Sequence, residues 1–121
     1  MSNLQAKRFE APDEVRPFQD GSGQVELVKL ADNAVGLGTF KPGWRWSEHV
    51  KPLSGTDSCQ VEHIGYVMEG RMVVAMDGGD QLEVGPGDVF LMPPGHDAWV
   101  VGGEPCVLLD FGGLSGYAKS S

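Results

Sequence analysis

Glycine and proline divide this chain into runs that are too short for long helices. The 121 residues include 18 glycines and 8 prolines. Turn-forming pairs such as Asp32-Asn33 and Glu69-Gly70 separate short apolar runs, a pattern that is typical of strands. Nine strands are predicted, at residues 24–30, 34–40, 44–50, 62–68, 71–76, 81–85, 88–92, 98–102 and 105–111. Many short strands at even spacing indicate a β-sandwich or a small closed barrel.

The strand pattern continues without a linker, a repeat or a block of charge. We therefore expect a single domain over residues 1–121. The barrel is predicted at about residues 24–112. Before it, residues 1–22 are expected to form an arm or an edge strand, and a short tail is expected after it.

Charge and cysteine content exclude several classes of protein. Lysine and arginine total 9 against 17 aspartates and glutamates, which gives a formal net charge of −8. This balance lacks the basic surface that a nucleic-acid binder needs, so no nucleic-acid partner is expected. No signal peptide or membrane span is evident, and two cysteines are too few for a disulfide scaffold. We expect a soluble cytoplasmic protein with two free thiols and no membrane partner.

The segment GDVFLMPPGHDAW, residues 87–99, carries a recognisable motif. Gly87, Pro93 and Gly95 occupy the fixed positions of the pattern G-x5-P-x-G-x2-H, and this segment resembles the second sequence motif of the cupins. The histidine position of that motif falls on Ala98, whereas this chain has His96 two residues earlier. Residues two apart on a strand share a face, so His96 can point into the same cavity.

The first cupin motif, G-x5-H-x-H-x3-4-E-x6-G, fits the chain from both ends. Counted forward from Gly43, its first histidine position is His49 and its second is Lys51. Counted back from Gly70, its glutamate position is His63. The spacer between these two halves is longer than in the family, and the whole resemblance covers about residues 36–111. It implies an all-β fold, a small cupin-like double-stranded β-helix (jelly-roll) barrel, and a homodimer.

All three histidines of the chain lie at or within two residues of cupin ligand positions. The resemblance therefore implies that His49, His63 and His96 bind a divalent transition metal, namely zinc, iron, manganese or nickel. Cys59, four residues before His63, is a candidate fourth ligand because it shares the face of His63 if the strand extends back to it. Two alternatives stay open. The histidines are hydrogen-bonded remnants of a lost site, as the cation Lys51 at a ligand position suggests, or Cys59 is a packing residue.

Other side chains around the motifs are candidates for roles beside the metal. If His49 faces the cavity on a strand, Arg45 shares its face and can bind a carboxylate or phosphate, whereas Trp44 and Trp46 face outward. The two tryptophans then need cover from the N-terminal segment or from a partner subunit. The alternative for Arg45 is a surface ion pair. Tyr66 and Arg45 are the candidate catalytic residues. Asp97, Glu48 and Glu62 are further acid–base candidates; for these and for Tyr66 the alternative is a solvated or structural role. Cys106 is expected in the core.

Three functions remain open from the sequence. The first is a metal-dependent enzyme acting on a small anionic or oxygen-rich molecule: an oxygenase if the metal is iron, or a lyase or isomerase if a redox-inert metal acts as a Lewis acid. The second is a non-catalytic module that binds or senses a small molecule in the same cavity. The third is a structural cupin with remnant histidines. The scaffold alone does not choose among them.

Overall fold

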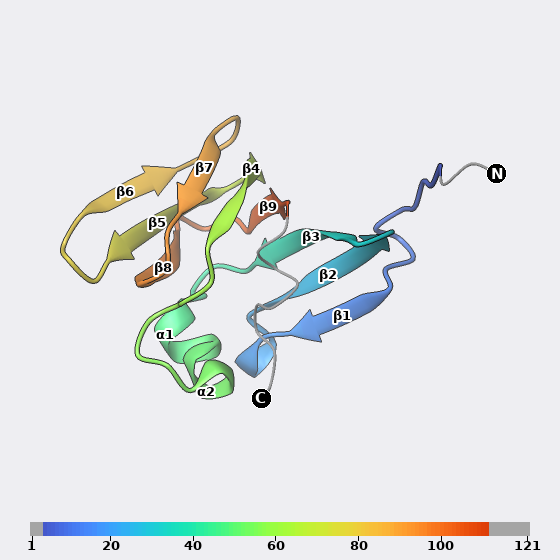
Figure 1. Ribbon diagram of the computed structural model, residues 1–121. Coiled ribbons are helices and arrows are strands. Elements are labelled where there is room, and N and C mark those ends of the chain that lie inside the picture. Colours follow the sequence, from blue (N-terminus) through green and yellow to red (C-terminus); the bar gives the residue numbers. More distant parts are fainter. Residues whose placement is uncertain (1–3, 112–121) are drawn as a thin grey trace.

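The computed structural model describes residues 4–111, and the expected C-terminal tail lies outside them. Figure 1 shows the elements in order, with strands dominating. They are β1 (Glu14–Pro17), the 3-10 turn η1 (Gln19–Gly21), β2 (Gly23–Leu30), β3 (Asn33–Phe40), α1 (Trp46–His49), α2 (Lys51–Ser54), β4 (His63–Glu69), β5 (Arg71–Met76), β6 (Gln81–Val84), β7 (Val89–Met92), β8 (His96–Val101) and β9 (Cys106–Asp110). The predicted all-β jelly-roll barrel is confirmed.

The strands form two antiparallel sheets. One has six strands in the order β1-β2-β3-β9-β4-β7, and the other has three strands in the order β6-β5-β8. Two isolated bridges cover the free edge of β8, one from Arg45 to Trp99 and one from Cys59 to His96. Strands β6 and β7 are edge strands of different sheets. Among the described residues no helix is long and apolar enough to cross a membrane.

Eight of the nine predicted strands are present, each within two residues of its expected bounds. The largest difference is in β8, which begins at His96, two residues earlier than predicted. The N-terminal segment contributes β1, which pairs with β2 at the edge of the six-stranded sheet. These strands were predictable because their alternating apolar residues face the core, as in β4 and β9.

The predicted strand at residues 44–50 is wrong, because this segment forms the helical turn α1. A strand would place Trp46, Glu48 and Val50 on one face and bury the glutamate between two apolar residues. The helix instead buries Trp46 and Val50, each 1% exposed, and leaves Glu48 at the surface. The carboxylate of Asp97 accepts a hydrogen bond from the Ser47 backbone N–H (3.1 Å), which satisfies a free donor of the first turn.

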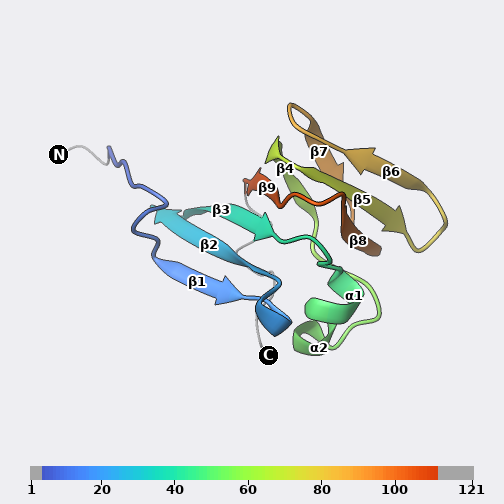
Figure 2. The same ribbon diagram turned by 180° about the vertical axis from the view of Figure 1, so that it is seen from behind.

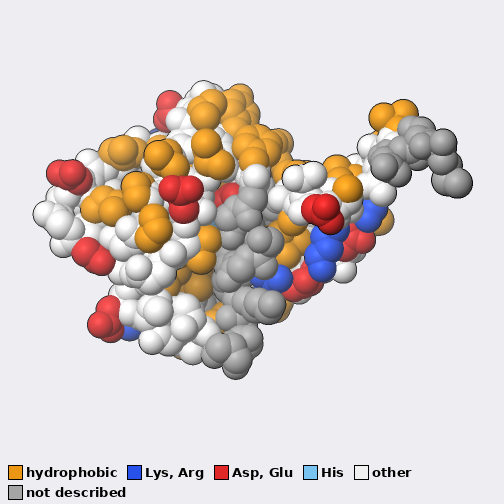
Figure 3. All heavy atoms as spheres, in the orientation of Figure 1, with side chains coloured by type: hydrophobic (Ala, Val, Ile, Leu, Met, Phe, Trp, Pro, Cys, Tyr) orange, Lys and Arg blue, Asp and Glu red, His pale blue; other side chains and the backbone are white. Residues whose placement is uncertain are grey.

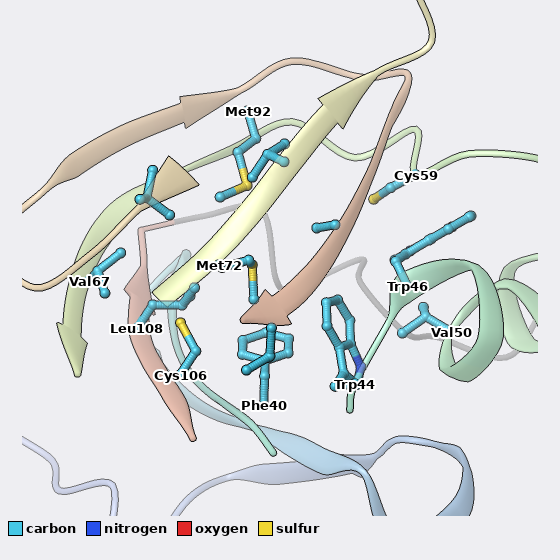
Figure 4. Close-up of a cluster of buried hydrophobic side chains, with 14 of the residues drawn as sticks. Phe40, Trp44, Trp46, Val50, Cys59, Val67, Met72, Met92, Cys106 and Leu108 are labelled. Carbon is cyan, nitrogen blue, oxygen red and sulfur yellow. The ribbon is translucent and has the colours of Figure 1, made fainter. Parts of the chain in front are cut away.

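Buried aromatic residues join the N-terminal part of the chain to the barrel. The ring centroids of Phe18 and Phe40 lie 5.2 Å apart, and Trp44 packs on both rings at 5.6 and 4.6 Å. Figure 4 shows Trp44 and Phe40 on one side of the core, with Met72 beside them. Both views of the ribbon place α1 and α2 together at one end of the molecule (Figure 2).

The expected outer-face position of Trp44 and Trp46 is therefore wrong. Trp44 is 2% exposed and Trp46 is 1% exposed, and both belong to the core. The change from strand to helix is the physical reason for Trp46, which α1 buries. Trp44 precedes the helix and is buried by its packing on Phe18 and Phe40. Phe18, which packs on Trp44, comes from the N-terminal segment, so part of the expected cover is found there.

Candidate metal centre

His63 opens strand β4 and faces the interior. Its side chain is almost fully buried, and its Nδ1 lies 2.6 Å from Oδ2 of Asp110, a carboxylate that is 1% exposed at the end of β9. A carboxylate oxygen accepts, so Nδ1 donates and Nε2 keeps its lone pair. Oriented in this way, Nε2 points toward Cys59, whose Sγ is 3.6 Å away.

His96 comes from the opposite sheet and is oriented by a backbone group. It is 2% exposed, and its Nδ1 lies 2.6 Å from the carbonyl oxygen of Pro93. A carbonyl can only accept, so the proton is on Nδ1 and the lone pair is on Nε2. Burial lowers the pKa of His96, which favours the neutral imidazole that a metal requires.

Cys59 is placed by the backbone next to His96. Its N–H donates to the carbonyl of His96 at 2.7 Å, and its own carbonyl accepts from the N–H of Gly95 at 2.7 Å. The thiol is 2% exposed. Burial raises the pKa of the Cys59 thiol to about 11, with the carboxylates of Asp110 and Asp97 adding to the increase. Without a neighbouring cation this cysteine stays a thiol at neutral pH.

Cys59, His63 and His96 form a group that could hold a metal ion. One ligand atom from each lies within 4.8 Å of the other two. Two ligands bound to one zinc ion at about 2.1 and 2.3 Å in tetrahedral geometry are about 3.6 Å apart. The distance between Sγ of Cys59 and Nε2 of His63 has this value. Two imidazoles and a sulfur are a donor set that zinc and other thiolate-tolerant metals accept.

His49, the third histidine expected in the site, is not part of this group. It lies in α1, where its Nδ1 accepts the backbone N–H of Arg45 at 3.0 Å. The expectation assumed a strand over residues 44–50, and the helix gives His49 a different direction. Cys59 is the third member of the group in place of His49. Its spacing of four residues from His63 is one of the two spacings, four or five, between the second histidine and the glutamate of the first cupin motif.

Arg45 and Tyr66 are placed outside the Cys59/His63/His96 group. The guanidinium of Arg45 lies 3.5 Å from a carboxylate oxygen of Asp97 and stacks 4.3 Å from the centre of the Trp99 ring. Arg45 therefore forms an ion pair, the alternative to binding the carboxylate or phosphate of a ligand. Tyr66 alternates with the buried His63 along β4 and is 38% exposed on the outer face. Neither side chain supplies a cation or an acid to the group.

Asp110 is the residue that the sequence analysis missed. Strand β9 buries Cys106, Leu108 and Asp110 in alternation, so one face of a short apolar strand ends in a carboxylate. This alternation was the available signal, because a buried aspartate needs a partner and the candidates were the histidines. Cys106 itself is buried in the core, as expected.

A small cavity adjoins the two histidines. Its volume is about 30 Å³, and its lining includes His63, His96, Asp110, Trp44 and Trp46. Within residues 4–111 neither indole N–H has a hydrogen-bond acceptor. A water needs about 10–15 Å³, so the cavity has room for a water or two and for nothing much larger.

The antiparallel jelly-roll with a buried cysteine and two buried histidines close together defines the class of protein, a small β-barrel with a candidate internal site. Its family model, the cupin domain, matches residues 36–112. The chain belongs to the cupin family. A comparison with curated protein sequences finds no match.

Solved structures agree with this fold. A protein of unknown function from Vibrio parahaemolyticus has a TM-score of 0.60 and 16% identity, with 81% of this chain and 95% of that chain covered. A sugar phosphate isomerase of the cupin superfamily from Silicibacter pomeroyi has a TM-score of 0.61 and 17% identity, covering 88% and 74%. The oxalate decarboxylase of Lactobacillus farciminis, in a formate complex, has a TM-score of 0.54 and 18% identity, covering 80% and 30%.

Proposed function

We propose that this protein is a metal-dependent cupin that binds one divalent transition metal through Cys59, His63 and His96 and binds a small molecule beside it. One observation carries the proposal: three buried ligand atoms from three separate segments lie within 4.8 Å of one another. Burying a thiol and two imidazoles together gains little from packing alone. A shared cation would stabilise all three.

Each residue has a defined task in this proposal. Asp110 accepts the Nδ1 proton of His63, and the Pro93 carbonyl accepts that of His96, so both Nε2 lone pairs are directed inward. Cys59 supplies the negative charge. A bound divalent ion would polarise an oxygen of the ligand as a Lewis acid. The surrounding apolar side chains exclude water and strengthen every charge interaction in the site.

The ligand set favours zinc among the four candidate metals, because thiolate suits zinc better than manganese. A redox-inert ion supports Lewis-acid chemistry, so a lyase or isomerase reaction is our first candidate and an oxygenase our second. Two similar structures are named as an isomerase and a decarboxylase, and neither name implies an oxygenase. A binding or sensing role would use the same metal without turnover.

Elemental analysis tests the metal. The protein should be purified without a metal-affinity tag, as wild type and as the variants Cys59→Ala, His63→Ala, His96→Ala and His49→Ala. We expect about one transition metal per chain in wild type and in His49→Ala, and a loss in the other three variants, because each removes one of three ligands. Occupancy that survives His63→Ala and His96→Ala would favour the structural cupin with remnant histidines. Turnover assays on the metal-loaded protein then distinguish an enzyme from a binding or sensing protein.

A homodimer and a cytoplasmic location also remain proposals. The outer face of β4 and β7 carries four exposed apolar side chains, namely Ile64, Met68, Val89 and Leu91. Figure 3 shows hydrophobic side chains gathered over this part of the molecule. Such a face supports an interface. A reduced thiol as a metal ligand supports a reducing compartment. Sedimentation of wild type and Val89→Glu tests the dimer, which the charged side chain should dissociate.

A further inference from the structure

The barrel interior is open along one line, between β6 and β7. These two strands are the edges of different sheets, and a groove of about 490 Å³ lies between them. Leu82 reveals the opening. It pairs with the buried Val74 and so faces inward, yet it is 56% exposed. By contrast Val84, two residues along the same strand, is 4% exposed.

The pairing of the strands places the groove next to Cys59, His63 and His96, which are called the metal group from here on. Met92, in its lining, pairs with His63 across β7 and β4. Met76, also in its lining, pairs with His96 across β5 and β8. Directly opposite residues share a face, so each histidine has a groove methionine as its neighbour.

A thin wall of two side chains separates the groove from the small cavity at the histidines. Phe90 and Met92 line both spaces, and each is 6% exposed. The inner cavity of about 30 Å³ holds no more than a water or two. The groove, by contrast, has the size of ordinary small-molecule sites, about 300–1,000 Å³. A ligand that reaches the histidines therefore needs the groove for most of its atoms.

The charges around the groove indicate the kind of ligand. Its inward-facing walls are apolar, and its lining includes the carboxylates Asp80, Glu83 and Asp88. Among the described residues no lysine, arginine or histidine lines it. Glu83 pairs with Arg71 at 3.4 Å on the outer side of β6, so Asp80 and Asp88 set the local charge. An anionic ligand would be repelled here, in a chain whose net charge is already −8.

We infer that the groove between β6 and β7 binds the body of the ligand, an uncharged apolar small molecule, and that Phe90 and Met92 decide which part of it reaches the metal group. This inference rests on the proposed function, since it names the ligand class of that site. It replaces the anionic ligand suggested by Arg45, which lies outside the metal group.

Fluorescent probes of matched shape test the inference on the metal-loaded protein. Phenylnaphthylamine is uncharged, and anilinonaphthalene sulfonate is an anionic relative. Each is titrated into wild type, Leu82→Glu and Ile64→Glu. Leu82 and Ile64 are similarly exposed, at 56% and 51%, but only Leu82 lines the groove. We expect saturable binding of the neutral probe to wild type and Ile64→Glu with equal Kd, and at least about tenfold weaker binding to Leu82→Glu, because the added carboxylate lies among apolar walls. The sulfonate should bind wild type at least about tenfold more weakly than the neutral probe.

Three results would overturn the inference. One is an equal Kd for Leu82→Glu and wild type, and another is equal binding of the two probes. The third is a loss in Ile64→Glu as large as in Leu82→Glu, which would place the probe on the outer face of β4, between copies of the chain. Metal content, measured on the same samples, keeps the two proposals separate. Probe results as expected without metal would contradict the proposed function and leave the groove assignment standing.

Discussion

Asp110 holds His63 of the metal group in place through a hydrogen bond, which makes it a positioning residue. A buried carboxylate at 2.6 Å fixes the ring of His63 and increases the electron density on Nε2. The Pro93 carbonyl does the same for His96 without a charge. The two imidazoles are therefore oriented before any ion arrives.

Replacing Asp110 with asparagine should weaken metal binding about 10–100-fold, because the amide keeps the hydrogen bond but removes the charge. The dissociation constant can be measured by competition with a chromophoric chelator. Asp88→Asn, at an exposed turn carboxylate, is the control and should bind as wild type does. Equal constants for Asp110→Asn and wild type would exclude a positioning role for the charge.

The buried thiol of Cys106 should make the folded protein less stable at alkaline pH. Burial raises the pKa of its thiol to about 11 from an ordinary value of 9.0. The folded state thus holds this proton more tightly than the unfolded state does. The stability it contributes is complete below about pH 9 and is lost as pH rises toward 11.

The free energy of unfolding, from urea titrations of metal-free protein, should fall by about 1–2 kcal/mol more in wild type than in Cys106→Val between these two pH values. Valine has a similar volume and cannot ionise. Cys59 remains in both proteins and serves as a common background. Parallel curves for the two proteins would show that Cys106 does not contribute.

At the scale of the element, strand β7 separates the groove between β6 and β7 from the metal group. It presents Phe90 and Met92 to the interior and Val89 and Leu91 to the outside. Because β7 is an edge strand, one row of side chains is all that lies between the groove and His63. Access to the group should therefore depend on single residues of this strand.

Met92→Ala should expose Cys59 to reagents, since it removes part of the wall shared by the groove and the inner cavity. The measurement is the rate of iodoacetamide labelling of metal-free protein, with mass spectrometry of the peptides that carry Cys59 and Cys106. We expect Cys59 to react several-fold faster while Cys106 stays slow. Ile64→Ala, on the outer face of β4 and outside both linings, should change neither. A parallel rise at both cysteines would indicate general loosening instead.

The sequence predicted the elements that are determined by a pattern among neighbouring residues. The strands follow from alternation and glycine turns, and His63 and His96 follow from motif spacing. Helix α1 could not be predicted in this way. It has four residues, and one of its free donors is satisfied by Asp97, which is distant in sequence. His49 was misplaced for the same reason, and Asp110 was missed because its partner lies 47 residues away.

At the scale of the whole molecule, the metal group draws on both sheets. His63 begins β4 in the six-stranded sheet, His96 begins β8 in the three-stranded sheet, and Cys59 lies in the loop between α2 and β4. Figure 4 shows Cys59 beside Trp46, at the end of the core where the helices lie.

An ion held by these residues would act as a removable cross-link between the sheets. Because the fold brings the three ligand atoms together, the ion would bind the folded chain more tightly than the unfolded one, and this difference stabilises the folded state. Metal-loaded protein should therefore melt at a higher temperature than metal-free protein, by an increment that grows with metal concentration. Calorimetry of both forms checks this, and His96→Ala should abolish the increment whereas His49→Ala should keep it. An increment that persists in His96→Ala would mean that the ion binds within one sheet. With two nitrogen ligands on strands and one sulfur ligand on a loop, the availability of metal would then set how long each molecule of this protein survives in the cell.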